Sequence, residues 1–380
     1  MIEFEKGKYN MKVVVEFIRG ISDGGAETLV KDYALLLNKQ LFQVQIVVLF
    51  QRYNCANARI LRDNNIIVIP IYKNWSIVVQ CFNKIFGRWY VPYRLKKILK
   101  ESNPIAFHSH MTVLKYLKPI SKYLQGIRLF YTCHSLPERY LGKEQKEERR
   151  AAKYLIEKND LRMIALHHEM AQEINTILDI KNTVVVHNGI DFNRFLNINE
   201  SKEEVRDSLN IPRDAYVIGH VGRFHPLKNH RFLIEVFRKT VEKKSNAILL
   251  LVGAGEELEN IKRIIETYGL SKRVIILSNR TDVPRLMRAM DVFVFPSIAE
   301  GLGIVLIEAQ ICGLRSIVST AVPKEAYVTE LVIPMSLEDS IENWCNAILD
   351  KTSTGVYSGC IDDYDMNKEI RKLENLYLGK

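Results

Sequence analysis

Two successive series of short apolar segments, each followed by turns and helical patterns, limit the folds open to this chain. The first series begins with residues 11–17 (MKVVVEF), a glycine-containing turn at 20–25, a helical pattern, and residues 44–50 (VQIVVLF). It continues with apolar segments at 66–71, 105–108 and 128–132. Strand, glycine turn, helix and strand make a βαβ unit, and strands that are apolar almost throughout belong to a parallel sheet covered on both faces.

The pattern restarts near the middle of the chain. After a strand at 183–186 and a polar stretch around 197–210, a second series runs through the apolar segments 217–221, 247–252, 274–277 and 292–295, with a helix predicted from about 229 to 241. A chain of 380 residues is also longer than one hydrophobic core usually serves. We therefore predict an α/β protein of two Rossmann-like, doubly wound domains with a boundary near 187–200. Such folds bind ligands outside the carboxyl ends of their strands.

The charge balance calls for an anionic partner. The chain has a formal net charge of +10, with 47% hydrophobic and 26% charged residues. Nucleic acid, phosphorylated substrates and acidic lipid headgroups would all match this charge. Since no nucleic-acid-binding motif is recognisable, we expect no nucleic-acid partner.

The cysteines and the N-terminus indicate a cytoplasmic protein. The cysteines follow no CxxC or other regular spacing, so we expect reduced, buried thiols. They lie at Cys55, Cys81, Cys133, Cys312, Cys345 and Cys360. Neither a signal-peptide core nor an apolar run of about 18 residues is found, so we expect no membrane-spanning segment.

A loop with two cations follows the strand at 217–221. Arg223 and Lys228 lie five residues apart in GRFHPLK, just before a predicted helix. A guanidinium fork with a lysine point charge suits a diphosphate that gains negative charge as it leaves. The alternative is a solvated basic loop, but the flanking glycine and the following helix N-terminus favour phosphate binding.

Residues 296–309 (PSIAEGLGIVLIEA) carry the sharpest signal for a ligand site. Glu300 ends the loop after the strand at 292–295, a glycine-containing turn leads into a helix, and Glu308 lies one to two turns inside it. The free amides at the helix start can hold an anion or hydroxyl groups, and the two carboxylates can accept hydrogen bonds from separate hydroxyls. A capped helix with an exposed Glu308 is the alternative, and the pattern does not choose between them.

Two other glycine turns and one histidine are weaker candidates. Gly24 and Gly25 open the first helix, where the backbone can approach a ligand closely, and Gly253 lies in a tight turn (VGAGEE). His134 ends a strand, where it is placed to donate a hydrogen bond and is expected to titrate near neutrality. A lone histidine is more often a satisfied surface or core residue. With no metal-ligand spacing in the chain, we predict no metal and no cofactor.

Residues 75–100 mix aromatic and basic side chains on a helical pattern. This combination suits contact with an anionic membrane surface. A core-facing helix with a solvated basic face is the alternative.

Taken in order, these motifs resemble the family 4 retaining glycosyltransferases of GT-B fold, and among them the transferases of bacterial exopolysaccharide and capsule assembly. The resemblance covers roughly residues 11–370. It depends on GGAE (24–27), the strand-end His134, HNGID (187–191), VGRFHPLKN (221–229), LLLVGAGEE (249–257) and EGLGIVLIE (300–308).

The resemblance implies two Rossmann-like domains that face each other across a cleft. Residues 1–190 would form an acceptor-binding domain and 191–360 a domain that binds a nucleotide-sugar. A C-terminal helix in 361–380 would pack back on the first domain.

The resemblance also implies roles for individual residues. Arg223 and Lys228 would hold the donor diphosphate, and Glu308 the ribose hydroxyls. His134 would contact the transferred sugar. The remaining donor-binding residues would be Gly24, Gly25, Gly253, Arg280, Val283, Glu300, Gly301, Leu302, Gly303 and Ile304, with the base read by main-chain groups of 280–283. His134, Arg223, Lys228 and Glu300 would be the catalytic residues.

The implied reaction is a metal-independent hexosyl transfer with retention of configuration. The donor would be a UDP-sugar, with GDP-mannose next, and the acceptor lipid-linked or an oligosaccharide. The protein would be cytoplasmic, with residues 75–100 placing it at the inner face of the cell membrane. Two alternatives stay open: a nucleotide-sugar epimerase of the same fold, and a basic binding protein without catalysis.

Overall fold

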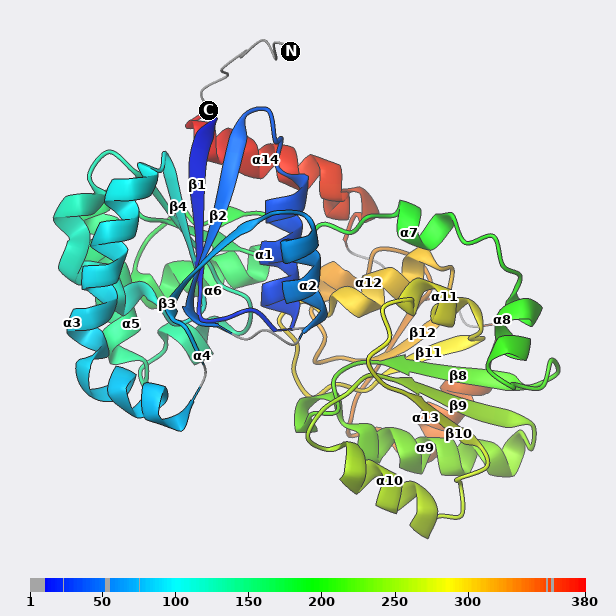
Figure 1. The fold of residues 1–380 in the computed structure, drawn as a ribbon. Helices are drawn as coiled ribbons and strands as arrows, with labels where there is room; N and C mark the ends of the chain where they lie inside the picture. The colour runs from blue at the N-terminus through cyan, green and yellow to red at the C-terminus, as the bar shows by residue number, and fades with distance from the viewer. Residues whose placement is uncertain (1–10, 23, 52–54, 75, 353–354, 357–358) are drawn as a thin grey trace, which may run out of the picture. The chain divides into compact units, whose positions relative to one another are not determined.

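The computed structural model describes residues 11–22, 24–51, 55–74, 76–352, 355–356 and 359–380. The chain divides into two compact units, one of residues 1–188 with 367–380 and one of residues 189–366 (Figure 1). The predicted third segment, 361–380, is therefore shared between the two units.

The first unit is a parallel sheet with helices on both faces. Its strand order is β3-β2-β1-β4-β5-β6-β7, with every pair parallel. The strands are β1 (Lys12–Ile18), β2 (Phe42–Phe50), β3 (Ile67–Tyr72), β4 (Ala106–His110), β5 (Arg128–Thr132), β6 (Arg162–Ala165) and β7 (Val184–Val185). The helices are α1 (Gly25–Leu36), α2 (Ala56–Asp63), α3 (Ile77–Ser102), α4 (Pro137–Leu141), α5 (Lys146–Asn159), α6 (His168–Leu178) and α14 (Met366–Leu378).

The second unit repeats this architecture with a six-stranded sheet. Its order is β10-β9-β8-β11-β12-β13, again with all pairs parallel. The strands are β8 (Tyr216–Val221), β9 (Ala247–Val252), β10 (Val274–Leu277), β11 (Val292–Phe295), β12 (Ser316–Ser319) and β13 (Val332–Met335). The helices are α7 (Asn193–Leu196), α8 (Lys202–Ser208), α9 (His230–Lys243), α10 (Leu258–Thr267), α11 (Val283–Arg288), α12 (Ile304–Ile311) and α13 (Ile341–Leu349).

Each face of the second sheet has its own apolar core. Helices α9, α10 and α13 cover one face, where Phe237, Ile261 and Trp344 pack on the sheet. Helices α8, α11 and α12 cover the other face through Val205 and Leu306, among others. The predicted doubly wound α/β fold is confirmed.

Strand order reverses once in each sheet, between β1 and β4 and between β8 and β11. Neighbouring strands then lead into helices on opposite faces, which opens a crevice at their carboxyl ends. The reversal therefore marks where each sheet can hold a ligand.

The C-terminal helix α14 belongs to the first unit, drawn in red beside β1 and β2 in Figure 1. Its Tyr377 is fully buried and packs edge-on against Phe42 of β2, with ring centroids 6.3 Å apart. The backbone N–H of His187 donates to the Glu369 carboxylate of the same helix at 2.6 Å.

All six cysteines are free, but only Cys133 and Cys345 are buried. The expectation of uniformly buried thiols is wrong, since Cys81 and Cys360 are exposed. In the described part of the chain, no helix is long and apolar enough to cross a membrane.

Candidate active site

The loops that follow β8 and β11 meet at the reversal of strand order in the second unit. Strands β8 and β11 are neighbours, with Val292 opposite Ile218. The backbone N–H of Ile298 donates to the carbonyl of Leu227 at 2.8 Å, which ties the two loops together. The two cations of one loop and the carboxylate of the other are thus held at one end of the sheet.

Lys228 and Glu300 form a close, mostly buried ion pair. Lys228 Nζ lies 2.6 Å from Glu300 Oε1, with the side chains 20% and 11% exposed. The ammonium also lies 4.7 Å from the ring centroid of Phe295, a cation–π contact. A lysine ammonium has three donors, so Lys228 can keep Glu300 and still bind an anion.

Arg223 is held more loosely. Its guanidinium donates to Glu256 Oε2 at 3.0 Å, and both side chains are largely exposed, at 68% and 48%. Because exposed ion pairs contribute little, a diphosphate can take this arginine from Glu256 at small cost. The sequence predicted Arg223 and Lys228 as the two cations of this site. Their pairing with Glu256 and Glu300 is visible only in the structure.

The turn after β9 supports the Arg223 loop through close backbone contact. A Cβ on Gly253 would lie 2.0 Å from the carbonyl oxygen of Gly222, and one on Gly255 would lie 2.3 Å from that of Phe224. Backbone bonds also join the loops, from Gly222 N–H to Val252 and from Phe224 N–H to Ala254. Gly253 is thus needed for packing, because the absence of a side chain lets the backbone of the Arg223 loop pass close by.

A left-handed glycine begins α12. Gly303 has φ +82°, and a Cβ there would lie 3.2 Å from Phe295 and 3.3 Å from Val322. Just before the helix, Gly301 is partly buried and Leu302 lies in the core. The first amides of α12, beginning with that of Ile304, have no carbonyl four residues earlier in the helix, so they can donate to an anion or a hydroxyl.

Glu308 lies in the fifth position of α12 and carries a strongly perturbed carboxyl. Burial raises its pKa to about 7, and the opposing influence is the positive charge of Arg194 on α7. No hydrogen-bond partner of this carboxyl is found among the described residues. A half-buried carboxyl that is unoccupied by protein groups suits the hydroxyls of a ligand. Arg194 was missed from the sequence because its proximity to Glu308 comes from packing of α7 on α12.

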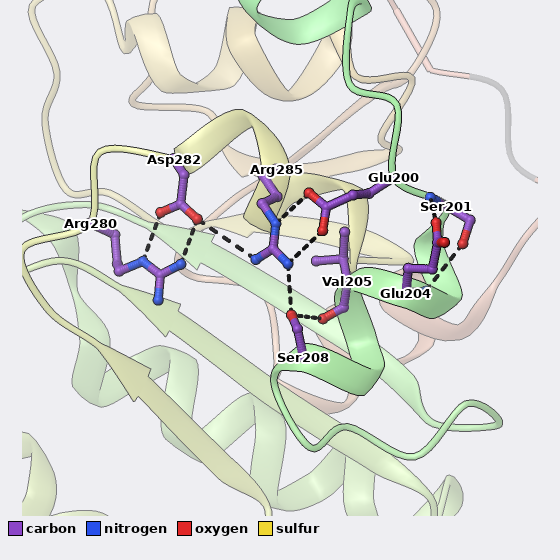
Figure 2. A network of polar contacts seen from close by, with 8 residues as sticks. All are labelled: Glu200, Ser201, Glu204, Val205, Ser208, Arg280, Asp282 and Arg285. Atoms are coloured by element: carbon purple, nitrogen blue, oxygen red, sulfur yellow. Dashed lines mark hydrogen bonds and ion pairs between the residues drawn. The ribbon is translucent and has the colours of Figure 1, made fainter.

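The predicted base-binding segment lies within a network of paired charges (Figure 2). Arg280 donates to both carboxylate oxygens of Asp282, at 2.7 and 2.5 Å. Arg285 donates to Glu200 at 2.6 and 2.8 Å and to Ser208 at 2.8 Å. The Arg280 side chain is thus occupied by Asp282, which leaves main-chain groups of 280–283 for a ligand. Val283 is the first residue of α11.

Two buried histidines support the cationic loop and were not found from the sequence. His220 of β8 bonds the carbonyl of Val294 through Nδ1 at 2.8 Å, while its Nε2 and both ring nitrogens of His230 have no hydrogen-bond partner in the described part of the chain. Burial lowers their pKa values to about 4 and about 2. The His230 ring stacks on Phe224, with centroids 4.3 Å apart. Two neutral rings thus support the loop, where cationic ones would repel Lys228.

In the first unit, Gly24 and Gly25 begin α1 after β1. A Cβ on Gly25 would meet none of the described residues within 4 Å, whereas one on Gly24 would lie 2.5 Å from the Glu27 carboxylate. Ser22 donates to the same carboxylate at 2.9 Å. The backbone is therefore open at Gly25, and Glu27 occupies the space beside Gly24.

His134 follows β5 and bonds a second histidine. Its Nε2 lies 2.8 Å from Nδ1 of His110, the last residue of β4. Burial, together with His110, holds the pKa of His134 well below its ordinary value. The expectation that His134 titrates near neutrality is therefore wrong, because the sequence showed neither its burial nor the neighbouring His110.

His110 in turn belongs to a buried cluster around Glu16 of β1. Among the described residues, Glu16, His108 and His110 place metal-type ligand atoms within 4.8 Å of one another. All of these atoms already have hydrogen-bond partners within the cluster, which His134, Thr132 and Tyr377 complete. We therefore describe it as a hydrogen-bond network, and the expectation of a metal-independent protein stays a prediction.

Two family models match the chain in succession. The model described as Glycosyltransferase Family 4 matches residues 23–194, and the model described as Glycosyl transferases group 1 matches residues 201–332.

Two curated relatives and one solved structure extend this similarity. UDP-Gal:alpha-D-GlcNAc-diphosphoundecaprenol alpha-1,3-galactosyltransferase of Escherichia coli is 28% identical over 306 residues, 75% of this chain and 78% of the relative. The putative glycosyltransferase EpsF of Bacillus subtilis (strain 168) is 26% identical over 91% of this chain and 89% of its own. The crystal structure of Anabaena HepE in complex with UDP and glucose has a TM-score of 0.74 at 19% identity, covering 97% of this chain and all of the other.

Proposed function

Because the chain belongs to the glycosyltransferases of GT-B fold, we propose that it moves a hexose or an N-acetylhexosamine from a UDP-sugar to a lipid-linked or oligosaccharide acceptor in extracellular polysaccharide synthesis. The observation that carries this proposal is the pairing of the Arg223–Lys228 loop with the loop that ends at Glu300. The name of the Escherichia coli relative includes UDP-Gal and a diphosphoundecaprenol-linked acceptor, and the Anabaena structure contains UDP and glucose. These support the donor and acceptor classes.

Arg223 and Lys228 are proposed to hold the diphosphate, and Glu308 to accept hydrogen bonds from the ribose hydroxyls. Glu300 and the amides of 301–304 would hold the sugar, and main-chain groups of 280–283 the base. Gly25, with open space around its α-carbon, would let the backbone approach the donor, and His134 would contact the transferred sugar. The two cations would supply the positive charge that the leaving group needs, so no metal is included.

The proposed reaction retains the configuration at the anomeric carbon by front-face attack. The bond from that carbon to the diphosphate oxygen breaks as the acceptor oxygen bonds to the same face. The acceptor's proton passes to the departing diphosphate, which leaves as UDP. Catalysis then consists of positioning and charge stabilisation. A sugar trapped covalently on a side chain, seen by mass spectrometry, would contradict this mechanism.

Thermal unfolding with a panel of UDP, GDP, ADP and CMP tests the donor site. Among the four nucleotides, we expect only UDP to raise Tm. At a UDP concentration about 100 times its Kd, binding stabilises the folded protein by about 2.7 kcal/mol, which corresponds to an increase of about 5–10 °C in Tm. Arg223→Ala and Glu308→Ala should each remove most of this shift, because one removes a diphosphate contact and the other a ribose contact.

The matched control is Arg238→Ala, which removes an arginine of the same unit that stacks on Tyr268. This variant should keep the full shift. Absence of stabilisation by any nucleotide would contradict the transferase proposal and favour a basic binding protein, one of the alternatives left open by the sequence.

We also propose that helix α3 contacts the anionic inner surface of the cell membrane. Its exposed apolar side chains recur three or four positions apart on one side of the helix, opposite the buried Gly87, Val91, Leu95 and Ile98. They are Ile77, Val78, Phe82, Ile85, Phe86, Trp89 and Tyr93. Exposed Lys84, Arg88, Lys97 and Lys100 lie on the same helix, and Trp75 lies outside the described residues.

Sedimentation with lipid vesicles measures this contact. We expect the protein to bind phosphatidylglycerol-containing vesicles and to release them as salt rises, because acidic headgroups attract the lysines and arginine. Phe86→Ser with Trp89→Ser should lower the partition coefficient at least about tenfold, since each large apolar side chain contributes about 1.5–3 kcal/mol on burial. Leu196→Ser, a control at a 62% exposed residue of α7, should not change it. Equal binding by the double variant would contradict the proposal.

A further inference from the structure

A continuous chain of hydrogen bonds runs through the core of the first unit and ends at His134. Glu16 Oε2 lies 2.7 Å from Nε2 of His110, and His110 Nδ1 lies 2.8 Å from Nε2 of His134. On its other side, Glu16 Oε1 accepts from the hydroxyl of Tyr377 at 2.7 Å, and that hydroxyl lies 2.6 Å from His108 Nδ1. Strands β1 and β4, the segment just after β5 and helix α14 supply the residues of this chain.

The direction of these hydrogen bonds depends on one proton. When Glu16 is protonated, its Oε2–H donates to the basic Nε2 of His110, so that His110 Nδ1–H donates to His134 and His134 carries its hydrogen on Nδ1. When Glu16 is ionised, it accepts from His110 Nε2–H, the Glu16–His110 and His110–His134 bonds both reverse, and His134 Nδ1 becomes an acceptor, while Tyr377 still donates to Glu16. No described residue bonds His134 Nδ1, and the ring is partly exposed.

We propose that Glu16 and His110 are positioning residues that set whether Nδ1 of His134 offers the transferred sugar a hydrogen-bond donor or an acceptor. This inference rests on the proposed contact between His134 and that sugar. It adds a specific requirement: transfer uses the form in which His134 Nδ1 is a donor, and ionisation of Glu16, two hydrogen bonds away, switches transfer off.

The surroundings of Glu16 favour its neutral form near pH 7. Burial raises its pKa to about 8, against the opposing hydrogen bond from Tyr377. The other titratable groups that face it are Tyr33 of α1, Tyr377 of α14, His108 and His110 of β4, and His134 beyond His110. Burial lowers the pKa of each of these histidines, so all stay neutral, and it raises the pKa of both tyrosines. Glu16 is therefore the group in this network that changes charge between pH 7 and 9.

The test is the pH dependence of kcat at saturating donor and acceptor, from pH 6 to 9.5. The wild type should lose about tenfold in kcat above pH 8, the effect of one misdirected hydrogen bond. Glu16→Gln should have a kcat at pH 7 within about twofold of the wild type. It should not show the alkaline limb, the decrease in kcat above pH 8, because its amide donates to His110 at every pH. Tyr377→Phe removes a hydrogen bond that favours the ionised form and should move the limb about one pH unit higher.

Glu148→Gln is the matched control. Glu148 is a second buried carboxyl of this unit, with its pKa raised to about 7 by burial, and it accepts from Leu114 N–H, apart from the network. Its variant should retain the alkaline limb. An unchanged limb in Glu16→Gln, in protein that is folded, would overturn the inference.

Denaturant unfolding gives a second readout that does not need activity. Between pH 4.5 and 8 the folded state keeps a proton on Glu16 that the unfolded state has lost, so the stability contributed by this group falls as pH rises. Glu16→Gln should therefore gain stability relative to the wild type across that range. A pH-independent difference would contradict the shifted titration of Glu16.

UDP binding separates this inference from the proposed function. It should be the same in wild type and Glu16→Gln from pH 7 to 9. A wild type that neither binds UDP nor transfers sugar would refute the proposed function. If the wild type transfers sugar but Glu16→Gln keeps the loss of kcat above pH 8, only the positioning role of Glu16 is refuted.

Discussion

Replacing Lys228 with methionine is expected to lower kcat about 10²–10³-fold, the usual effect of removing one group that stabilises transition-state charge. Negative charge grows on the diphosphate as the sugar departs, and a mostly buried ammonium stabilises it more than a solvated one would. Methionine keeps an unbranched apolar stem against Phe295 but removes the ammonium, and with it the ion pair to Glu300. Initial rates at saturating donor and acceptor measure the effect.

Lys239→Met provides the control for this result. Lys239 lies on α9 and pairs with Glu242 of the same helix at 2.6 Å, on an exposed surface. Its loss should leave kcat unchanged. A decrease below about threefold in Lys228→Met would show that the diphosphate does not depend on this ammonium.

Replacing Gly253 with alanine is expected to destabilise the second unit by about 2–3 kcal/mol and to abolish stabilisation by UDP. The new Cβ would lie 2.0 Å from the carbonyl oxygen of Gly222 and 2.9 Å from its carbon. Both atoms are backbone, so the Arg223 loop must move away and its bonds to Val252 and Ala254 must stretch or break. The Tm of the transition that UDP shifts in the wild type should fall by about 5–10 °C.

Gly313→Ala separates this clash from simple backbone strain. Gly313 has φ +73°, and a Cβ there would meet nothing within 4 Å. Its alanine variant should therefore show only the strain of a left-handed residue, about 1–2 kcal/mol, and keep the response to UDP. Equal losses in both variants, with UDP binding retained in Gly253→Ala, would contradict the structural role of the close approach.

Most strands could be predicted from the sequence, but β6, β12 and β13 were missed. The apolar segments 247–252, 274–277 and 292–295 coincide with β9, β10 and β11. Strand β12 was missed because it begins and ends with serine. Both serines are fully buried and donate to the main chain, Ser316 to Leu314 and Ser319 to Ser297. A buried hydroxyl with a backbone partner looks polar in a sequence, because its acceptor is visible only in the fold.

The parts of the candidate site that could be predicted are those whose residues lie close together in the sequence. Arg223 and Lys228 lie on one loop after one strand, and Gly303 and Glu308 lie on one turn and helix. The pairing of Lys228 with Glu300 and the effect of Arg194 on Glu308 join residues far apart in the chain. No periodicity in the sequence encodes such pairs.

The sequence by itself determined the two α/β series, the loops that follow β8 and β11, and the cations and carboxylates on those loops. These features depend on local order: apolar runs make buried parallel strands, and glycine allows backbone geometry that other residues resist. Only the tertiary structure decided the environment of each ionisable group. From the sequence, His134 is a lone histidine at the end of a strand, but in the fold it ends a chain of hydrogen bonds that reaches Tyr377 of α14. The pKa of such a group depends on burial and on neighbours brought together by packing, and neither is a property of the sequence around it.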